Sequence, residues 1–156
     1  MMLFPAARGI LFASGGPMQD FKKLAVWSKS HELVLEVYRV TARLPERSYP
    51  GLLSQLRRSA SSIPANIVEG CGHASQVEFA RFLQMAGASA LELAYHLLLA
   101  RDLGALNAVQ FARLEARTQQ VRQMLGGLIR RVRTDLEEKK TPAKRRSAAD
   151  GVERTA

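Results

Sequence analysis

The segment 52–70 constrains the fold most, because it carries two regular stripes when it is placed on an α-helix. One stripe is apolar and has the spacing of a helix seam that faces a core: Leu52, Leu56, Ala60, Ile63 and Ile67. The other is polar and lies about 100° further around the helix: Gln55, Ser59, Ser62, Asn66 and Glu69. A regular polar stripe indicates a second contact surface, either a subunit boundary or a buried hydrogen-bond network. The alternative is chance placement of small polar residues on a solvated flank.

Pro64 lies inside this expected helix and leaves two interpretations of its second half. Proline removes one backbone N–H and crowds the carbonyl of the residue four positions earlier, here Ala60, so a kink is expected. Alternatively, Pro64 begins a separate short helix. The apolar stripe continues in phase through Pro64, which favours one kinked helix. Gly70 and Gly72 are then expected to end it.

A first helix is expected before this segment, from Val26-Trp27 to Leu44-Pro45, since the residue before a proline is disfavoured in a helix. Its predicted inner face is Trp27, Val34, Val37, Thr41 and Leu44, flanked by Leu33 and Val40. A third helix starts at the capping box Ser75-Gln76-Val77-Glu78 and stops at Gly104. Asn107 and Gln110 repeat the capping signature for a fourth helix.

The third and fourth helices carry apolar seams that alternate steps of three and four residues. The third seam is Phe79, Leu83, Ala86, Ala90, Leu93, Leu97 and Ala100, and the fourth is Phe111, Leu114, Thr118, Val121, Leu125, Leu128 and Val132. Four such helices with short connections predict an all-α, up-down-up-down antiparallel four-helix bundle with a Pro-kinked second helix.

Gly126-Gly127 interrupts good helix formers in the fourth helix, at a cost of about 1 kcal/mol for each glycine. Folding the fourth helix back on the third places these glycines near residues 85–87. We expect a close contact between the two helices there. The alternative is a local bend.

A chain of 156 residues is long enough for one domain with a real core. We expect residues 1–19 to be a flexible extension, 20–136 to form the bundle, and 137–156 to be a disordered basic tail. The apolar run near the N-terminus is broken by Pro5, Arg8 and Gly9, which argues against a signal peptide and makes Met18 the expected initiator. No apolar run approaches the roughly 20 residues that span a bilayer, so no membrane partner is expected.

The chain is strongly basic, with a formal charge of +9, of which +6 belongs to residues 20–136. The candidate phosphate contacts are Arg57, Arg58, Arg117, Arg122, Arg130, Arg131 and Arg133. They predict binding to the backbone or shape of RNA or DNA, because an aromatic content of 6% is too low for a base-stacking platform. The alternative is that these arginines are solvated faces and favourable charges at helix C-termini.

Nothing in the sequence favours catalysis. His31, His73 and His96 come from three different segments, and no Glu-x-x-His motif of a di-iron bundle is present. Cys71 is the single cysteine, which excludes an intramolecular disulfide and suits a reducing cytoplasm. We therefore expect no enzyme activity, no cofactor and no metal site.

With these residues in view, the chain resembles the bacterial four-helix-bundle proteins known as 23S rRNA intervening-sequence proteins. The resemblance covers about residues 21–132 and rests on Leu24-Ala25-Val26-Trp27, Ser54-Gln55-Leu56-Arg57-Arg58, Ser62-Ile63-Pro64-Ala65-Asn66-Ile67-Val68-Glu69-Gly70, Phe79-Ala80-Arg81-Phe82-Leu83, Ser89 with Leu91-Glu92-Leu93, and Leu99-Ala100-Arg101-Asp102-Leu103-Gly104. It departs from the family pattern at Ala94, commonly Glu, and at Ala88, often Gly. The arginine-rich end of the fourth helix is also not a family signature.

The resemblance implies a cytoplasmic bundle that assembles as a homo-oligomeric ring, typically a homopentamer. The fold is also similar to the basic accessory proteins of diversity-generating retroelements, which work with a reverse transcriptase and its RNA. We therefore expect a non-catalytic, nucleic-acid-associated accessory protein whose partners are its own copies, RNA or DNA, and a nucleic-acid enzyme. The alternative is a structural or adaptor protein that acts through self-assembly and protein contacts without nucleic acid.

Overall fold

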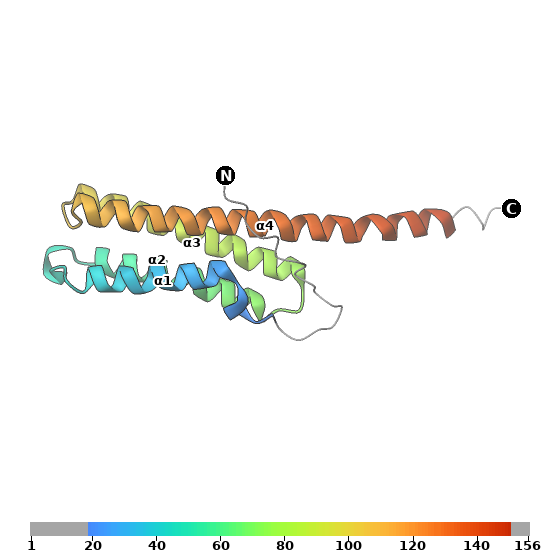
Figure 1. Ribbon diagram of the computed structural model, residues 1–156, viewed down its shortest axis with the longest axis horizontal. Coiled ribbons are helices and arrows are strands. Elements are labelled where there is room, and N and C mark those ends of the chain that lie inside the picture. The colour runs from blue at the N-terminus through green and yellow to red at the C-terminus, as the bar shows by residue number, and fades with distance from the viewer. Residues whose placement is uncertain (1–18, 151–156) are drawn as a thin grey trace.

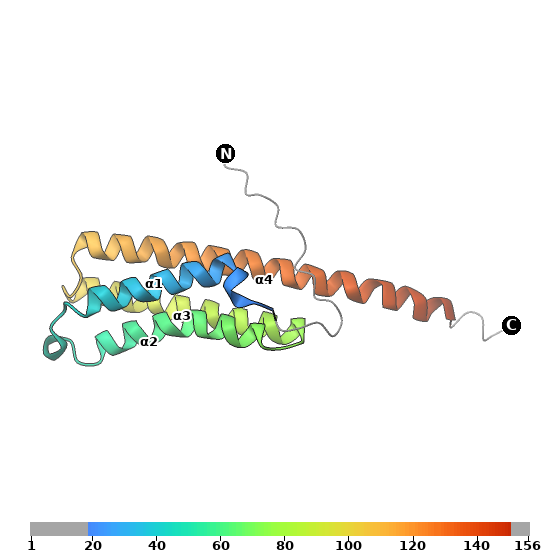
Figure 2. The same ribbon diagram turned by 60° about the horizontal axis from the view of Figure 1, so that its bottom comes forward.

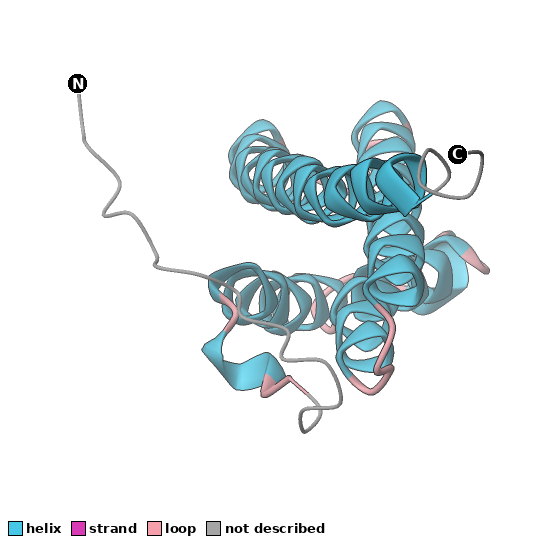
Figure 3. Ribbon diagram, turned by 90° about the vertical axis from the view of Figure 1, so that its right-hand side faces the viewer, coloured by secondary structure: helices cyan, strands magenta, loops and turns pink. Residues whose placement is uncertain are grey.

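The computed structural model describes residues 19–150, with side chains as far as Lys139, and has four α-helices: α1 (Ala25–Thr41), α2 (Leu52–Cys71), α3 (Gln76–Asp102) and α4 (Ala108–Asp150). Two 3-10 helices, η1 (Phe21–Lys23) and η2 (Glu46–Ser48), precede α1 and α2. Each α-helix packs on the next, and α4 packs back on α1, so α1 and α3 stand at diagonal corners (Figures 1 and 2). Between the described helices there are only loops and turns (Figure 3). The predicted all-α antiparallel bundle is confirmed.

The predicted seams of α2, α3 and α4 form the core of the bundle. Every member of the α2 and α3 seams is buried, and in α4 only Leu128 is partly exposed. The α1 face was predicted less well. Leu33, expected at the flank, is fully buried, whereas Trp27 and Val34 are only partly buried. The inner face of α1 is therefore rotated towards Leu33 and Val37.

α2 is one uninterrupted helix that contains Pro64, so the alternative of a separate short helix beginning there is wrong. The kink itself stays a prediction. Of the two glycines expected to end α2, Gly72 is its C-cap residue, whereas Gly70 is the buried penultimate residue of the helix. A Cβ atom at this position would lie 2.9 Å from the Cβ of Phe82 and 3.1 Å from Cδ2 of Phe79, both on α3. Gly70 is needed because two aromatic side chains of α3 press on the α2 backbone.

Local capping signals fix where the helices begin and end. The Ser75 hydroxyl accepts from the Glu78 amide at 3.5 Å, but the Glu78 carboxylate pairs with Arg81 instead of closing the capping box. At α4 the box is complete: the Gln110 amide donates to Asn107 Oδ1 at 2.8 Å, and the Asn107 amide donates to Gln110 Oε1 at 3.0 Å. Gly104 ends α3 at a φ of 73°, a conformation that favours glycine.

α4 extends much further than the sequence indicated. The expected tail began at residue 137, but the helix continues to Asp150 and runs past the other three helices (Figure 1). Residues 137–150 are thus helical in the structure, whereas the predicted disorder of the tail stays a prediction. The segment lacks apolar periodicity; its Ala, Lys, Arg and Glu residues favour a helix, whereas Pro142 opposes one. The expectations for residues 1–18, including initiation at Met18, and for 151–156 lie outside the described residues.

The proposed role of Gly126-Gly127 in a close contact between α3 and α4 is also wrong. A Cβ atom at Gly127 would meet no atom within 4 Å, and one at Gly126 would meet only a guanidinium nitrogen of Arg130, at 3.5 Å. The two glycines cost helix propensity without making room for a neighbouring helix.

By length and apolar composition alone, α3 could cross a membrane, contrary to the expectation that no segment of the chain would. This is weak support for a membrane span, because the core helix of a water-soluble bundle meets the same criterion. In this structure the seam of α3 is buried against the neighbouring helices.

The glycines give a matched pair of stability predictions. Gly70→Ala should destabilise the fold by about 1–3 kcal/mol, because the added methyl group overlaps Phe82. Gly127→Ala should stabilise it by about 0.5–1 kcal/mol, because alanine gains helix propensity in open space. Urea denaturation followed by circular dichroism measures both. Equal effects of the two substitutions would contradict the close approach at Gly70.

Candidate nucleic-acid interface

The seven candidate arginines divide into those used inside the fold and those left at the surface. Arg57 on α2 belongs to the first group. Its Nε donates to the Thr41 hydroxyl of α1 at 2.9 Å, and its Nη1 lies 3.6 Å from the Glu46 carboxylate. The guanidinium also stands 6.0 Å from the ring centroid of Tyr38. Arg57 therefore ties α2 to the end of α1.

Arg117 also works within the fold, through a carboxylate that the sequence analysis missed. Glu36 of α1 has a side chain only 6% exposed, and it forms ion pairs with Arg113 and Arg117 of α4. The Nε of Arg117 lies 2.8 Å from a Glu36 oxygen. Two arginines that converge on a buried carboxylate compensate the cost of removing its charge from water.

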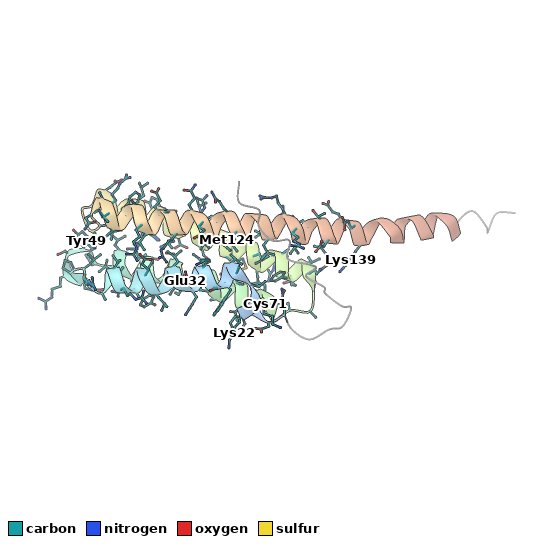
Figure 4. All side chains as sticks on the ribbon, in the orientation of Figure 1. Lys22, Glu32, Tyr49, Cys71, Met124 and Lys139 are labelled. Carbon is teal, nitrogen blue, oxygen red and sulfur yellow. The ribbon has the colours of Figure 1, made fainter. Side chains whose placement is uncertain are left out.

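Glu32, one turn before Glu36, extends this network to the surface of α1 (labelled in Figure 4). It forms an ion pair with Lys29 at 2.9 Å and lies 4.0 Å from Arg117. The hydrogen bond from Lys29 holds the pKa of the Glu32 carboxyl below its ordinary value. The sequence did contain a signal for this network of ion pairs. Glu32 and Glu36 are four residues apart and share one side of a helix, as Arg113 and Arg117 do.

Loss of the buried carboxylate should weaken the contact between α1 and α4. Glu36→Gln should lower the free energy of unfolding by about 2–4 kcal/mol at pH 7, because two arginines lose their charge partner at a desolvated site. Urea denaturation measures the change. Glu32→Gln is the matched control, and it should have little effect because that carboxylate is solvated. A Glu36 variant as stable as the control would show that the pair contributes nothing.

The other five candidates are exposed: Arg58, Arg122, Arg130, Arg131 and Arg133. Arg122, Arg130 and Arg133 share one side of α4, within about 80° at 100° per residue, and we call them the α4 arginine stripe. Arg131 lies on a different side of α4, and Arg58 lies on α2, at the diagonal corner. The candidates therefore form one aligned group of three and two separate sites.

Lys139 marks the level at which α4 leaves the bundle. Its Nζ donates to Gln76 Oε1 at the start of α3, at 3.1 Å (Figure 4). At the opposite end of the bundle, the Tyr49 hydroxyl lies 3.5 Å from the Leu103 carbonyl (Figure 4). The α4 arginine stripe therefore lies along the middle of α4, before the level at which the helix leaves the bundle.

The middle of the polar stripe of α2 forms a hydrogen-bond chain with α3. Asn66 Nδ2 donates to Ser62 Oγ at 3.1 Å, and the Ser62 and Ser89 hydroxyls are 2.9 Å apart. Ser89 in turn donates to the Met85 carbonyl at 3.1 Å. If Ser62 donates to Ser89, every hydroxyl proton in this chain has an acceptor. At this level the polar stripe is a contact between two helices of one subunit.

The ends of the polar stripe differ from its middle. Ser59 is buried, and its hydroxyl donates to the Gln55 carbonyl of the preceding turn at 2.7 Å. Gln55 is half-buried and Glu69 is exposed. The stripe thus passes from a buried hydrogen-bond network in its middle to the surface at Glu69, and a subunit boundary along it stays a prediction.

His31 lies on α1, His96 on α3, and Cys71 and His73 lie at and just after the end of α2. His31 stacks on Trp27 with ring centroids 5.3 Å apart, and His73 stacks on Phe82 at 5.0 Å. Among the described residues no group of three His, Cys, Asp or Glu side chains could hold a metal ion. Cys71 is buried at the end of α2. Its burial, and secondly the charge of Asp20, raise the pKa of the thiol to about 11.

The raised pKa of Cys71 predicts slow alkylation of the folded protein. At pH 8 a thiol with the ordinary pKa of about 8.5 is about one quarter thiolate, so iodoacetamide should react with native Cys71 on the order of 100-fold more slowly than with the urea-unfolded chain. Because the thiolate fraction grows with pH, the native rate should keep rising until the pH reaches about 11. Equal native and unfolded rates, measured by mass spectrometry, would contradict a buried thiol.

The fold and these contacts define a basic four-helix-bundle protein with a hydrogen-bonded serine seam between its second and third helices. The model of the family described as 23S rRNA-intervening sequence protein matches residues 22–127, and the chain belongs to that family. The resemblance seen in the sequence is therefore confirmed.

A solved structure supports the same assignment. The chain is similar to a protein of unknown function from the S23 ribosomal protein family of Bacteroides thetaiotaomicron, with a TM-score of 0.64 and 25% sequence identity. The similarity covers 67% of this chain and 95% of that one. A search of curated proteins finds no match.

Proposed function

We propose that this protein is a non-catalytic, homo-oligomeric, nucleic-acid-associated accessory protein of the cytoplasm. The α4 arginine stripe carries the proposal: Arg122, Arg130 and Arg133 are exposed, aligned, and free of any ion pair among the described contacts. No carboxylate lies between residues 116 and 134 to neutralise them. Arginines in this arrangement suit phosphate groups spaced along a nucleic-acid backbone.

Two of the seven candidate arginines are not part of this proposal. Arg57 and Arg117 are committed to Thr41 and Glu36, so releasing them for phosphates would break contacts between helices. The exposed Arg58 and Arg131 remain secondary candidates outside the stripe.

Self-assembly would strengthen a weak electrostatic contact. Each copy presents the α4 arginine stripe and a projecting basic end of α4, so a ring of copies, a homopentamer by analogy with the family, would offer several phosphate sites at once. Linked sites raise the overall affinity without any new contact. A nucleic-acid enzyme that shares the same RNA or DNA is the protein partner that this role would require.

The adaptor function remains the second candidate, supported by one observation. The exposed apolar side chains of α3, among them Leu91 and Tyr95, suit a protein contact and not a phosphate backbone. An adaptor that works only through protein contacts would bind no nucleic acid at low salt.

Removal of the stripe tests the nucleic-acid function. A protein with Arg122→Ala, Arg130→Ala and Arg133→Ala should bind a fluorescent single-stranded RNA more weakly, with the slope of log affinity against log salt reduced by about 2. Fluorescence anisotropy across a salt series measures both. Lys22→Ala, Lys23→Ala and Arg47→Ala remove three other exposed charges as a matched control and should change binding less.

Three results would contradict this function. Wild-type binding that does not change with salt would exclude phosphate recognition, and equal losses in the two triple variants would exclude the stripe as its site. Absence of any binding at low salt would favour the adaptor function.

A further inference from the structure

The outer side of α3 carries an apolar stripe that no part of the described chain covers. Leu91, Tyr95 and Leu98 are between 39% and 60% exposed, and Ala88 lies on the same side one turn earlier. Their steps of three, four and three residues match a heptad seam. Single exposed apolar residues are ordinary, but four at seam spacing form a second, outward-facing helix contact.

A second apolar group lies on the outer side of α1, at the diagonal corner of the bundle. Leu35 and Tyr38 are 41% and 46% exposed, and His31 and Ala42 extend the same side in both directions. Their steps of four, three and four residues again match a heptad seam. The two groups each run for about 15–17 Å at 1.5 Å per residue, so they are alike in length.

Opposite charges flank the two apolar groups. Glu92 stands exposed beside Leu91 on α3, Arg39 stands exposed beside Tyr38 on α1, and Arg43 stands exposed beside Ala42 just after the end of α1. In the described part of the chain none of the three forms an ion pair. Charges at the edge of an apolar contact select its partner more than they strengthen it.

We infer that the outer face of α3 (Ala88, Leu91, Tyr95 and Leu98) docks on the outer face of α1 (His31, Leu35, Tyr38 and Ala42) of a second copy of this chain, with Glu92 meeting Arg39. This inference rests on the proposed self-assembly and names the surfaces that perform it.

Pairing of each face with itself is disfavoured by charge. A two-fold pairing of α3 would place Glu92 near the Glu92 of the copy, because this residue lies at the middle of the stripe. A two-fold pairing of α1 would likewise bring arginines together. Like charges that face each other across an interface are destabilising. Contact between two different faces is head-to-tail, and it closes into a ring when the rotation between neighbours allows it.

Size-exclusion chromatography with light scattering tests the inference on the full chain. The wild type should be an oligomer, whereas Leu91→Ser with Tyr95→Ser, or Leu35→Ser with Tyr38→Ser, should give the monomer mass of 17.2 kDa. Circular dichroism should show unchanged helix content in both variants. Val109→Ser is the matched control, because Val109 is 78% exposed but lies outside both faces, and its oligomer should keep the wild-type mass.

Charge reversal identifies which faces meet. Glu92→Arg and Arg39→Glu should each weaken assembly at low salt, and the double variant should recover the wild-type mass. An oligomeric wild type whose mass neither serine variant changes would overturn the inference while leaving self-assembly through other surfaces, such as Glu69, in place. Disruption by the α3 variant alone would overturn the head-to-tail pairing. A monomeric wild type at all concentrations would overturn both the inference and the proposed assembly.

Discussion

Close packing between α2 and α3 is the constraint on which the rest of the bundle depends. Near one end, Gly70 lets Phe79 and Phe82 press on the α2 backbone, and in the middle the Ser62 and Ser89 hydroxyls share a hydrogen bond. The two contacts fix the register of the helices, because a shift of one turn would clash at the glycine and leave the hydroxyls unpaired. The apolar seams can then close around the paired helices α2 and α3.

α1 closes the bundle by a different means. It reaches α4 through the buried Glu36 carboxylate and two arginines, and it reaches α2 through Arg57 and Thr41. Charged contacts that need defined partners specify one arrangement more strongly than aliphatic packing does. Arg57, Arg113 and Arg117 thus stabilise contacts with α1 although their side chains still reach solvent.

The surface that remains has two separate characters. Along the middle of α4 it is cationic and suits phosphate groups, whereas the outer sides of α3 and α1 are apolar and suit protein contacts. These regions do not compete for the same residues. A protein of this family can therefore assemble through its apolar faces and present its arginines to nucleic acid, and the proposed functions are compatible on one bundle.

The sequence by itself determined the four helices and the inner sides of α2, α3 and α4, because seam spacing and capping residues act over a few positions. The buried seams of α2 and α3 and the complete capping box at Asn107 illustrate this. Only the tertiary structure decided which arginines meet Glu36, that Gly70 makes room for side chains of α3, and that no neighbouring helix packs closely on Gly126 or Gly127. Those outcomes depend on the rotation and register of neighbouring helices. Both are determined jointly by residues that lie far apart in the chain.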